Sequence, residues 1–163
     1  MDDKLLEILN NADYDNNLLN VDIDVNIQSK LLDYQINHVQ KLIGALEKNN
    51  IAIDTSDTGC GKTYGALALC KQLNLTPIVI CPKSIMSNWY NVAKIFDVKI
   101  VFVCNYETLR RGKYYENGNI DKRINCPYVI FNEKLKKNNW TNITNNKIII
   151  FDEVHFCKSK TTL

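Results

Sequence analysis

The chain has 163 residues, of which 45% are hydrophobic and 23% are charged, and its formal net charge is +2. This length and composition are typical of one ordinary globular domain with a core large enough for independent stability. No run approaches the ~18 continuous apolar residues that a membrane-spanning helix needs, and the N-terminus lacks the layout of a secretory signal. We therefore expect a soluble protein that works inside the cell, in the cytoplasm or nucleus.

The charge is unevenly distributed along the chain. Residues 1–25 contain seven acidic residues and one lysine, a net charge of −6, so the remainder carries +8. An acidic N-terminal leader, placed at residues 1–29, followed by a basic body at 30–163, suits a nucleic-acid partner.

Neither the cysteines nor the histidines suggest a metal site. The six cysteines include no Cys-x-x-Cys pair, and the only two histidines, His38 and His155, are not spaced as metal ligands. We expect free thiols, most of them buried in the core.

Hydrophobic patterning predicts alternating helices and short strands. Near-continuous Val/Ile strands interleaved with helices are typical of an α/β fold, in which a mostly parallel sheet is covered by helices on both faces. The segment 112–146 is rich in Asn and Lys, and we expect it to be a less regular surface excursion. In chain order, we predict a short helix within 5–20, an amphipathic helix at 31–48, a buried strand at 51–53, a helix at 62–73, a strand at 77–81, a helix at 84–96, and strands at 98–104, 128–131 and 148–151.

The run from Ser56 to Thr63, Ser-Asp-Thr-Gly-Cys-Gly-Lys-Thr, is typical of a phosphate-binding loop. A strand that enters a Gly-containing turn and then a helix N-terminus offers several N–H donors to one anion. Lys62 is expected to reach the β- and γ-phosphates, and the Thr63 hydroxyl to ligate Mg²⁺. Ser56 stands where glycine is usual. The loop residues expected to contact the nucleotide are Thr58, Gly59, Cys60, Gly61, Lys62 and Thr63.

Asp152-Glu153-Val154-His155, a DEVH box, follows the last predicted strand. Ligands of open α/β sheets bind at the carboxyl ends of the strands. Asp152 is therefore predicted to hold Mg²⁺, largely through water, and Glu153 to orient and deprotonate the attacking water. His155 is predicted to sense the γ-phosphate. With Lys62, these three residues form the predicted catalytic set for ATP hydrolysis.

Together these motifs resemble the first RecA-like motor lobe of superfamily two helicases and translocases, and more closely their Swi/Snf-like branch, which occurs in many viral and phage proteins. Further segments carry the resemblance over about residues 30–160. They are Leu31-Leu32-Asp33-Tyr34-Gln35, the run Cys81-Pro82-Lys83-Ser84-Ile85-Met86-Ser87-Asn88-Trp89, the run Asn105-Tyr106-Glu107-Thr108-Leu109-Arg110-Arg111, and Lys158.

The resemblance implies roles for residues outside the two main motifs. It implies that Gln35 recognises adenine. It also implies that two segments contact the nucleic-acid backbone, with DNA a better candidate than RNA. Those segments supply Pro82, Lys83 and Ser84, and Arg110 and Arg111.

Each of these roles has an alternative. Gln35 also suits an exposed helix face, and Lys83 and Ser84 also suit the start of a helix, where Ser is a good N-cap. Trp89 is expected to pack in the core, and the basic cluster of Arg110, Arg111 and Lys113 also suits a solvated surface. Phe156 and Ser159 depart from the residues common in the branch, a basic residue and Asn.

No Ser-Ala-Thr-like motif and no second lobe follow the acidic box in this sequence. We therefore expect a lobe that binds Mg-ATP weakly and hydrolyses it slowly, completed by a second RecA-like lobe in another chain or one that has been lost. Two other interpretations stay open. One is a non-catalytic nucleotide or nucleic-acid binding module, and the other is an unrelated P-loop phosphotransferase.

Overall fold

The computed structural model describes residues 21–132, 137–144 and 146–154. It divides into two compact units, Met1–Gly65 (unit 1) and Ala66–Leu163 (unit 2), with the division inside helix α4 (Lys62–Gln72). The predicted helix within 5–20 lies outside the described residues, as do His155, Phe156, Lys158 and Ser159. The predicted boundary between an acidic leader and the following lobe stays a prediction.

The described part of unit 1 contains two helices before the phosphate loop. The short α2 (Val25–Gln28) was not predicted, and the side chain of Asp24 caps it by accepting from the backbone N–H of Asn26 at 2.7 Å. Helix α3 (Asp33–Asn49) confirms the predicted amphipathic helix, with Val39 and Ile43 fully buried. It ends at Asn50, whose φ of +56° is left-handed, the usual way for a helix to stop.

The predicted strand at 51–53 is wrong. These residues form no strand, and Ile51 and Ile53 are 43% and 45% exposed. A strand requires a neighbouring backbone to accept and donate its hydrogen bonds, and no described residue forms a ladder with this segment. The apolar run alone does not fix the conformation, because burial and pairing decide it.

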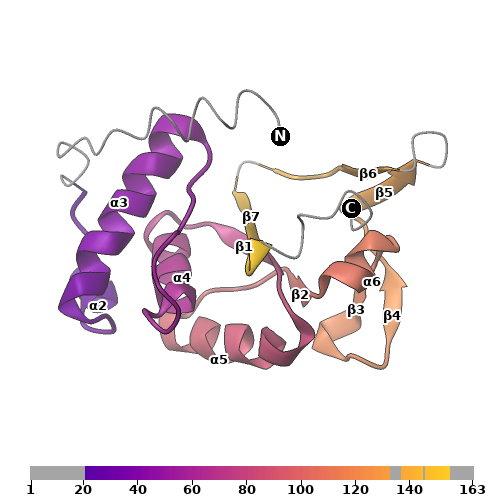
Figure 1. Ribbon diagram of the computed structural model, residues 1–163, viewed down its shortest axis with the longest axis horizontal. Coiled ribbons are helices and arrows are strands. Elements are labelled where there is room, and N and C mark those ends of the chain that lie inside the picture. The colour runs from indigo at the N-terminus through magenta and orange to yellow at the C-terminus, as the bar shows by residue number, and fades with distance from the viewer. Residues whose placement is uncertain (1–20, 133–136, 145, 155–163) are drawn as a thin grey trace. The chain divides into compact units, whose positions relative to one another are not determined.

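The sheet of unit 2 joins three parallel strands, β1 (Thr76–Ile80), β2 (Phe102–Cys104) and β7 (Lys147–Phe151), in the order β2-β1-β7 (Figure 1). In the central strand β1, Ile78, Val79 and Ile80 are fully inaccessible. Because the strands are parallel, their carboxyl ends meet at one edge of the sheet, where predicted site residues follow β1, β2 and β7. The mixed α/β class is confirmed.

Helices in unit 2 follow the prediction closely. A 3-10 turn, η2 (Lys83–Ile85), leads into α5 (Met86–Phe96), so the predicted helix at 84–96 is confirmed apart from its first turn. Helix α5 buries Trp89, which confirms its predicted place in the core. Helix α6 (Tyr106–Arg110) follows β2, which is shorter than predicted. No helix of the described residues combines the length and apolar character needed to cross a membrane.

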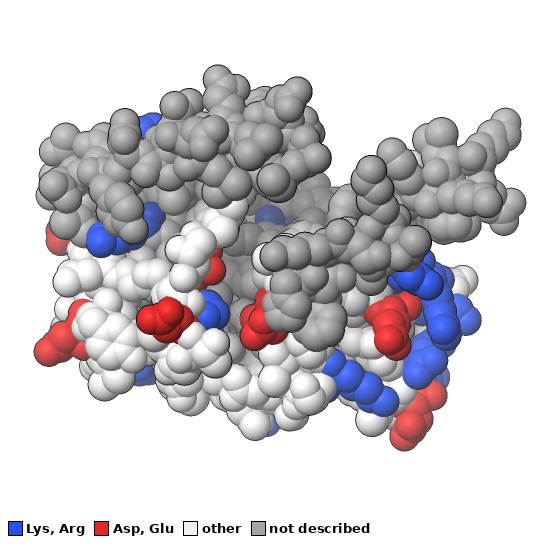
Figure 2. Space-filling model, in the orientation of Figure 1, with Lys and Arg blue, Asp and Glu red and all other residues white. Residues whose placement is uncertain are grey.

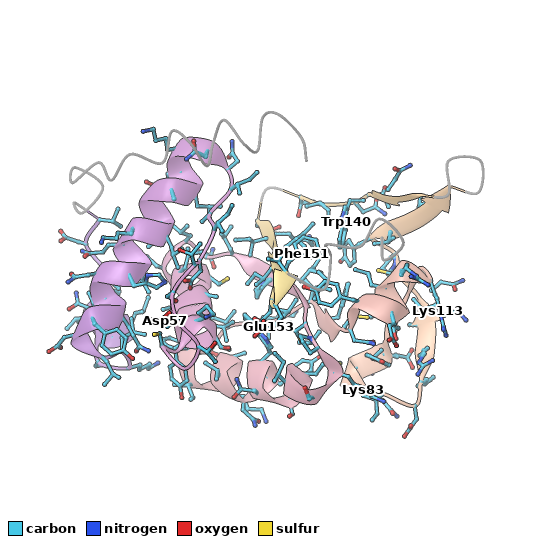
Figure 3. All side chains as sticks on the ribbon, in the orientation of Figure 1. Asp57, Lys83, Lys113, Trp140, Phe151 and Glu153 are labelled. Atoms are coloured by element: carbon cyan, nitrogen blue, oxygen red, sulfur yellow. The ribbon has the colours of Figure 1, made fainter. Side chains whose placement is uncertain are left out.

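The segment 112–146 is more regular than the sequence suggests. It forms two antiparallel hairpins, β3 (Lys113–Tyr115) with β4 (Arg123–Asn125), and β5 (Val129–Asn132) with β6 (Lys137–Trp140), and a short 3-10 turn η3 (Glu116–Gly118) lies inside the first. The strand predicted at 128–131 is thereby confirmed as β5. The second hairpin packs beside β7, since the rings of Trp140 and Phe151 meet edge to face with centroids 6.5 Å apart (Figure 3).

The thiols behave as predicted. The five described cysteines are free, and four of them are buried. Burial raises the pKa of Cys70, Cys81 and Cys104 to about 12, so these thiols stay protonated at neutral pH. The described part of the chain also contains no group of three His, Cys, Asp or Glu side chains that could hold a metal ion by itself.

Candidate nucleotide and nucleic-acid sites

The phosphate loop in unit 1 is a tight turn that opens helix α4. Gly59 and Gly61 have φ values of +89° and +81°, which L side chains rarely adopt, so the glycine spacing is a backbone requirement. The side chain of Lys62 folds back along the loop, where its Nζ donates to the carbonyl oxygens of Ser56 at 2.7 Å and Asp57 at 2.9 Å. A single ammonium group and the first turn of a helix therefore lie beside one curled backbone segment.

The remaining loop residues lie where the motif requires small, accessible groups. Thr58 is exposed, while Cys60 and Thr63 are half-buried. The backbone N–H of Tyr64 already donates to the carbonyl of Gly61 at 2.8 Å, so Thr63 sits in the first turn of α4. N–H groups before this point have no partner inside the helix, as at any helix start.

Gln35 ties the start of α3 to the phosphate loop. Its Oε1 accepts from the backbone N–H of Leu32 at 2.9 Å, and its Nε2 donates to the carbonyl of Cys60 at 3.1 Å. Tyr34 donates its hydroxyl to the same carbonyl at 3.4 Å. Gln35 is only 7% exposed, so the alternative of a solvated helix face is wrong. Its predicted contact with adenine stays a prediction.

A cluster of His38, Asp54 and Ser56 anchors the entry to the loop, and no motif in the sequence predicted it. Asp54 Oδ1 accepts from the Ser56 hydroxyl at 2.6 Å and the Ser56 N–H at 3.0 Å, and Oδ2 lies 2.9 Å from His38 Nε2. Partial burial opposes ionisation of Asp54, but the bonds from Ser56 and His38 outweigh it and lower the pKa. Ser56 stands where glycine is usual in this motif, and its hydroxyl bonds Asp54 and so orders the loop.

Asp152 is held at the carboxyl end of β7 in unit 2 by three hydrogen bonds. Its N–H donates to the carbonyl of Ile80 at 2.8 Å, which extends the pairing between β7 and β1. Its own carbonyl accepts from the Tyr106 hydroxyl at 2.6 Å, and its Oδ2 accepts from Trp89 Nε1 at 2.9 Å. The carboxylate is half-buried, and no pattern in the sequence indicated these two aromatic partners.

Glu153 leaves the extended conformation of the strand. Its φ of +57° is left-handed, and its side chain is exposed. Adjacent residues of a regular strand point to opposite faces, so this turn is what frees the acidic pair from that alternation. Burial and the nearby Asp152 charge together raise the pKa of the Cys81 thiol, which therefore adds no negative charge at this edge.

The two predicted nucleic-acid segments follow β1 and β2. Pro82 precedes the 3-10 turn η2, and Lys83 and Ser84 are exposed within that turn. Lys83 and Ser84 do begin a helical segment, as the alternative predicted, but the N-cap of that segment is Pro82 and not Ser84. Arg110 is the last residue of α6, and both it and Arg111 are exposed.

Basic side chains gather on one side of unit 2. Figure 2 shows Lys and Arg, with some Asp and Glu among them, over α6 and the β3–β4 hairpin. Figure 3 shows Glu153 at the end of β7, and Lys83 on the side of the unit where Lys113 projects. The basic groups therefore lie over elements that follow β2, the strand that also precedes Arg110 and Arg111.

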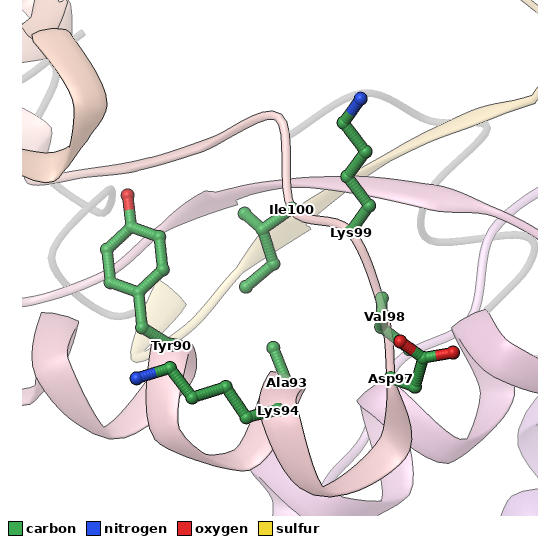
Figure 4. Close-up of a pocket in the computed structure, with 7 residues that line it drawn as sticks. All are labelled: Tyr90, Ala93, Lys94, Asp97, Val98, Lys99 and Ile100. Carbon is green, nitrogen blue, oxygen red and sulfur yellow. The ribbon is translucent and has the colours of Figure 1, made fainter.

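A hollow of about 510 Å³ lies elsewhere in unit 2, at the carboxyl end of α5 (Figure 4). None of the predicted site residues lines it, so it does not contribute to the candidate site. Its lining residues are Tyr90, Ala93, Lys94, Asp97, Val98, Lys99 and Ile100.

Comparison with known proteins identifies the family. The chain belongs to the family described as "Type III restriction enzyme, res subunit" (ResIII), whose model matches residues 28–162. This is a helicase-related ATPase domain with a RecA-like fold, so the predicted fold and the resemblance to superfamily two helicases are confirmed.

Relatives with curated names agree with this assignment. The chain is 44% identical over 138 residues to "Putative ATP-dependent RNA helicase L364" of Acanthamoeba polyphaga mimivirus, covering 82% of this chain and 26% of that protein. It is 29% identical over 150 residues to the ISWI chromatin-remodeling complex ATPase CHR17 of Arabidopsis thaliana, covering 84% of this chain and 14% of that protein. It is 26% identical over 143 residues to "Putative helicase 161L" of Invertebrate iridescent virus 6, covering 86% of this chain and 31% of that protein.

The chain therefore spans less than a third of each of these relatives. No solved structure matches it with significance.

Proposed function

We propose that this chain is the ATP-binding lobe of a DNA or RNA helicase-like or translocase ATPase, which couples Mg-ATP hydrolysis to engagement of nucleic acid. The observation that carries the proposal is the loop geometry of unit 1. Two glycines in left-handed conformations turn the backbone into a helix start, and the Lys62 ammonium lies beside that turn. A concave set of N–H groups with one cation is what a triphosphate requires.

In this proposal the loop backbone from Thr58 to Thr63 binds the phosphates. Lys62 exchanges its two carbonyl partners for β- and γ-phosphate oxygens, because an ammonium group bonds an anion more strongly than a neutral carbonyl. Gln35 holds the loop at Cys60 and, on the family resemblance, reads the adenine edge.

The donor set suits Mg²⁺, which proteins usually bind through one or two carboxylates together with substrate phosphates. Asp152 and the Thr63 hydroxyl would hold it, and when bound with ATP it neutralises charge on the phosphates. Glu153 orients and deprotonates the attacking water, with His155 next to it in sequence. The family membership and the order of the motifs along the chain support the proposal that both motifs act on one nucleotide.

The nucleic-acid partner is engaged mainly through its backbone. Lys83, Ser84 and Arg111 are exposed on segments that follow β1 and β2, as a sequence-independent contact requires. We place DNA ahead of RNA on the Swi/Snf-like resemblance, whereas one relative is named as an RNA helicase. The polymer that stimulates turnover decides between them.

We further propose that full activity needs a second RecA-like lobe that supplies transition-state arginines. Such an arginine increases the rate by ~10³–10⁵ in related phosphoryl transfers. Turnover by this chain alone is therefore expected to be slow.

The test is steady-state ATP turnover with no polymer and with mixed-sequence single-stranded DNA, duplex DNA and single-stranded RNA. Turnover that rises with one polymer and disappears in Lys62→Ala is the expected result. Mg-ATP that is neither bound nor hydrolysed by the wild-type chain would contradict the proposal.

A non-catalytic binding module is the second candidate. It is favoured by the contacts that already engage both charged groups, since Lys62 bonds loop carbonyls and Asp152 accepts from Trp89. Weak Mg-ATP binding without turnover under any polymer would select this candidate.

A further inference from the structure

The two aromatic donors to Asp152 belong to the two elements that carry the proposed nucleic-acid contacts. Trp89 lies in the first turns of α5, directly after the η2 turn that contains Lys83. Tyr106 is the first residue of α6, whose last residue is Arg110. Each segment is therefore connected to the acidic strand end by a few residues of helix and one hydrogen bond.

Both hydrogen bonds are short, and both aromatic donors are buried. Trp89 is 2% exposed and Tyr106 is 8% exposed, and their bonds to Asp152 measure 2.9 and 2.6 Å. Trp89 donates to the carboxylate, and hydrogen bonds to an ionised carboxylate are stronger than neutral ones. Tyr106 donates to the backbone carbonyl of the same residue and so holds the end of the strand. A shift of either helix start must therefore move Asp152 or break a bond to it.

The third bond completes the arrangement. The Asp152 N–H donates to the carbonyl of Ile80, the last residue of β1, and Ile80 is followed by the segment Cys81–Ser84. The N–H, the carbonyl and the carboxylate of Asp152 are thus held by β1, α6 and α5, and each of these elements leads to a proposed nucleic-acid contact.

We infer that Trp89 and Tyr106 are positioning residues that couple nucleic-acid binding to Mg-ATP binding by setting the orientation of Asp152. This inference rests on the proposed function, because it requires Asp152 to bind Mg²⁺ and the two segments to bind nucleic acid. The coupling is reciprocal, so bound nucleic acid and bound Mg-ATP change each other's affinity by the same factor.

The test measures the Kd of Mg-ATP by calorimetry with and without saturating mixed-sequence single-stranded DNA, duplex DNA or single-stranded RNA. The ratio of the two Kd values is the coupling factor, expected to be about 5-fold or more in the wild-type chain. Tyr106→Phe removes one hydroxyl and preserves the ring, and should bring the factor within about twofold of unity while leaving the Kd for the polymer alone nearly unchanged.

A matched control separates coupling from general packing. Tyr115 is also buried, and its hydroxyl donates to Asn105 Oδ1 at 2.8 Å without touching Asp152. Tyr115→Phe should keep the wild-type coupling factor. Trp89→Phe should lose the coupling as Tyr106→Phe does, and Tyr106→Phe decides the outcome if the Trp89 variant does not fold.

Three results would overturn the inference. They are a wild-type factor of unity, a factor that survives in Tyr106→Phe, and an equal loss in Tyr115→Phe. Failure of the proposed function itself has a different signature, since the wild-type chain would then bind no Mg-ATP in any condition.

Discussion

Substitution of Gly61 by alanine tests the construction of the phosphate loop, because Gly59 offers a matched control in the same turn. Both residues have left-handed φ values, +81° for Gly61 and +89° for Gly59. A Cβ on Gly61 would collide with the side-chain nitrogen of Gln35, whereas a Cβ on Gly59 would meet nothing within 4 Å. The two variants therefore share the backbone strain and differ in the contact with Gln35.

The magnitudes follow from these two terms. An L residue in the left-handed conformation costs roughly 1–2 kcal/mol, so each variant should lose about that much folding stability from backbone strain. In Gly61→Ala the Gln35 amide must also leave the carbonyl of Cys60, and a buried hydrogen bond of this kind contributes about 0.5–1.5 kcal/mol. Gly61→Ala should thus be destabilised by about 1.5–3.5 kcal/mol, against about 1–2 kcal/mol for Gly59→Ala.

The assay is urea denaturation of both variants, repeated in a Gln35→Ala background. Without the Gln35 side chain, the two alanine substitutions should cost the same, so the double-mutant cycle should show a coupling of about 1 kcal/mol. Equal destabilisation of Gly59→Ala and Gly61→Ala in the wild-type background would refute the reasoning, as would strict additivity with Gln35→Ala.

Three further predictions concern Asp54, Cys70 and the basic pair of Lys83 and Arg111. The lowered pKa of Asp54 contributes stability that is complete above pH 3.8, its ordinary pKa, and is lost as the pH falls through the pKa of the folded state. Asp54→Asn should therefore reduce the loss of melting temperature at acidic pH. An unchanged loss would contradict this. The pKa of Cys70 is raised from 9.0 to about 12, so the protonated thiol contributes stability that is lost as the pH rises above 9.0. The free energy of unfolding in urea should therefore fall less between neutral and alkaline pH in Cys70→Ala than in the wild type. For duplex-DNA binding, the slope of log K against log salt concentration should become shallower by about 1.8 when Lys83 and Arg111 are both replaced by alanine. Lys48→Ala in α3 should leave this slope unchanged.

Much of the fold could be predicted because its strands are continuous apolar runs. The isoleucine run of β7 and the Ile-Val-Ile run of β1 pair directly, with Ile78 opposite Ile149. The same signal failed at Ile51–Ile53, where the described residues offer no pairing partner. Of the hairpins in 112–146 only β5 was predicted; β3, β4 and β6 were missed because they are short and rich in polar residues, so that no clear alternation marks them.

The candidate site, too, could be predicted only where a local sequence pattern marks it. Glycine spacing identified the phosphate loop, because left-handed φ values at Gly59 and Gly61 are a local requirement. The partners of Asp152 were not predictable, since Trp89 and Tyr106 are 63 and 46 residues distant in sequence and only folding brings them to the strand end. Contacts of this separation leave no periodic trace in a single sequence.

Equilibrium binding of Mg-ATP shows whether the loop from Thr58 to Thr63 is a nucleotide site. Calorimetry on the wild-type chain, with Lys62→Ala as the comparison, requires neither turnover nor a nucleic acid. We expect one site in the wild-type chain and at least about tenfold weaker binding in the variant, since the Lys62 ammonium is the cation that the loop offers to the phosphates. No binding by the wild-type chain, or equal binding by Lys62→Ala, would contradict this expectation.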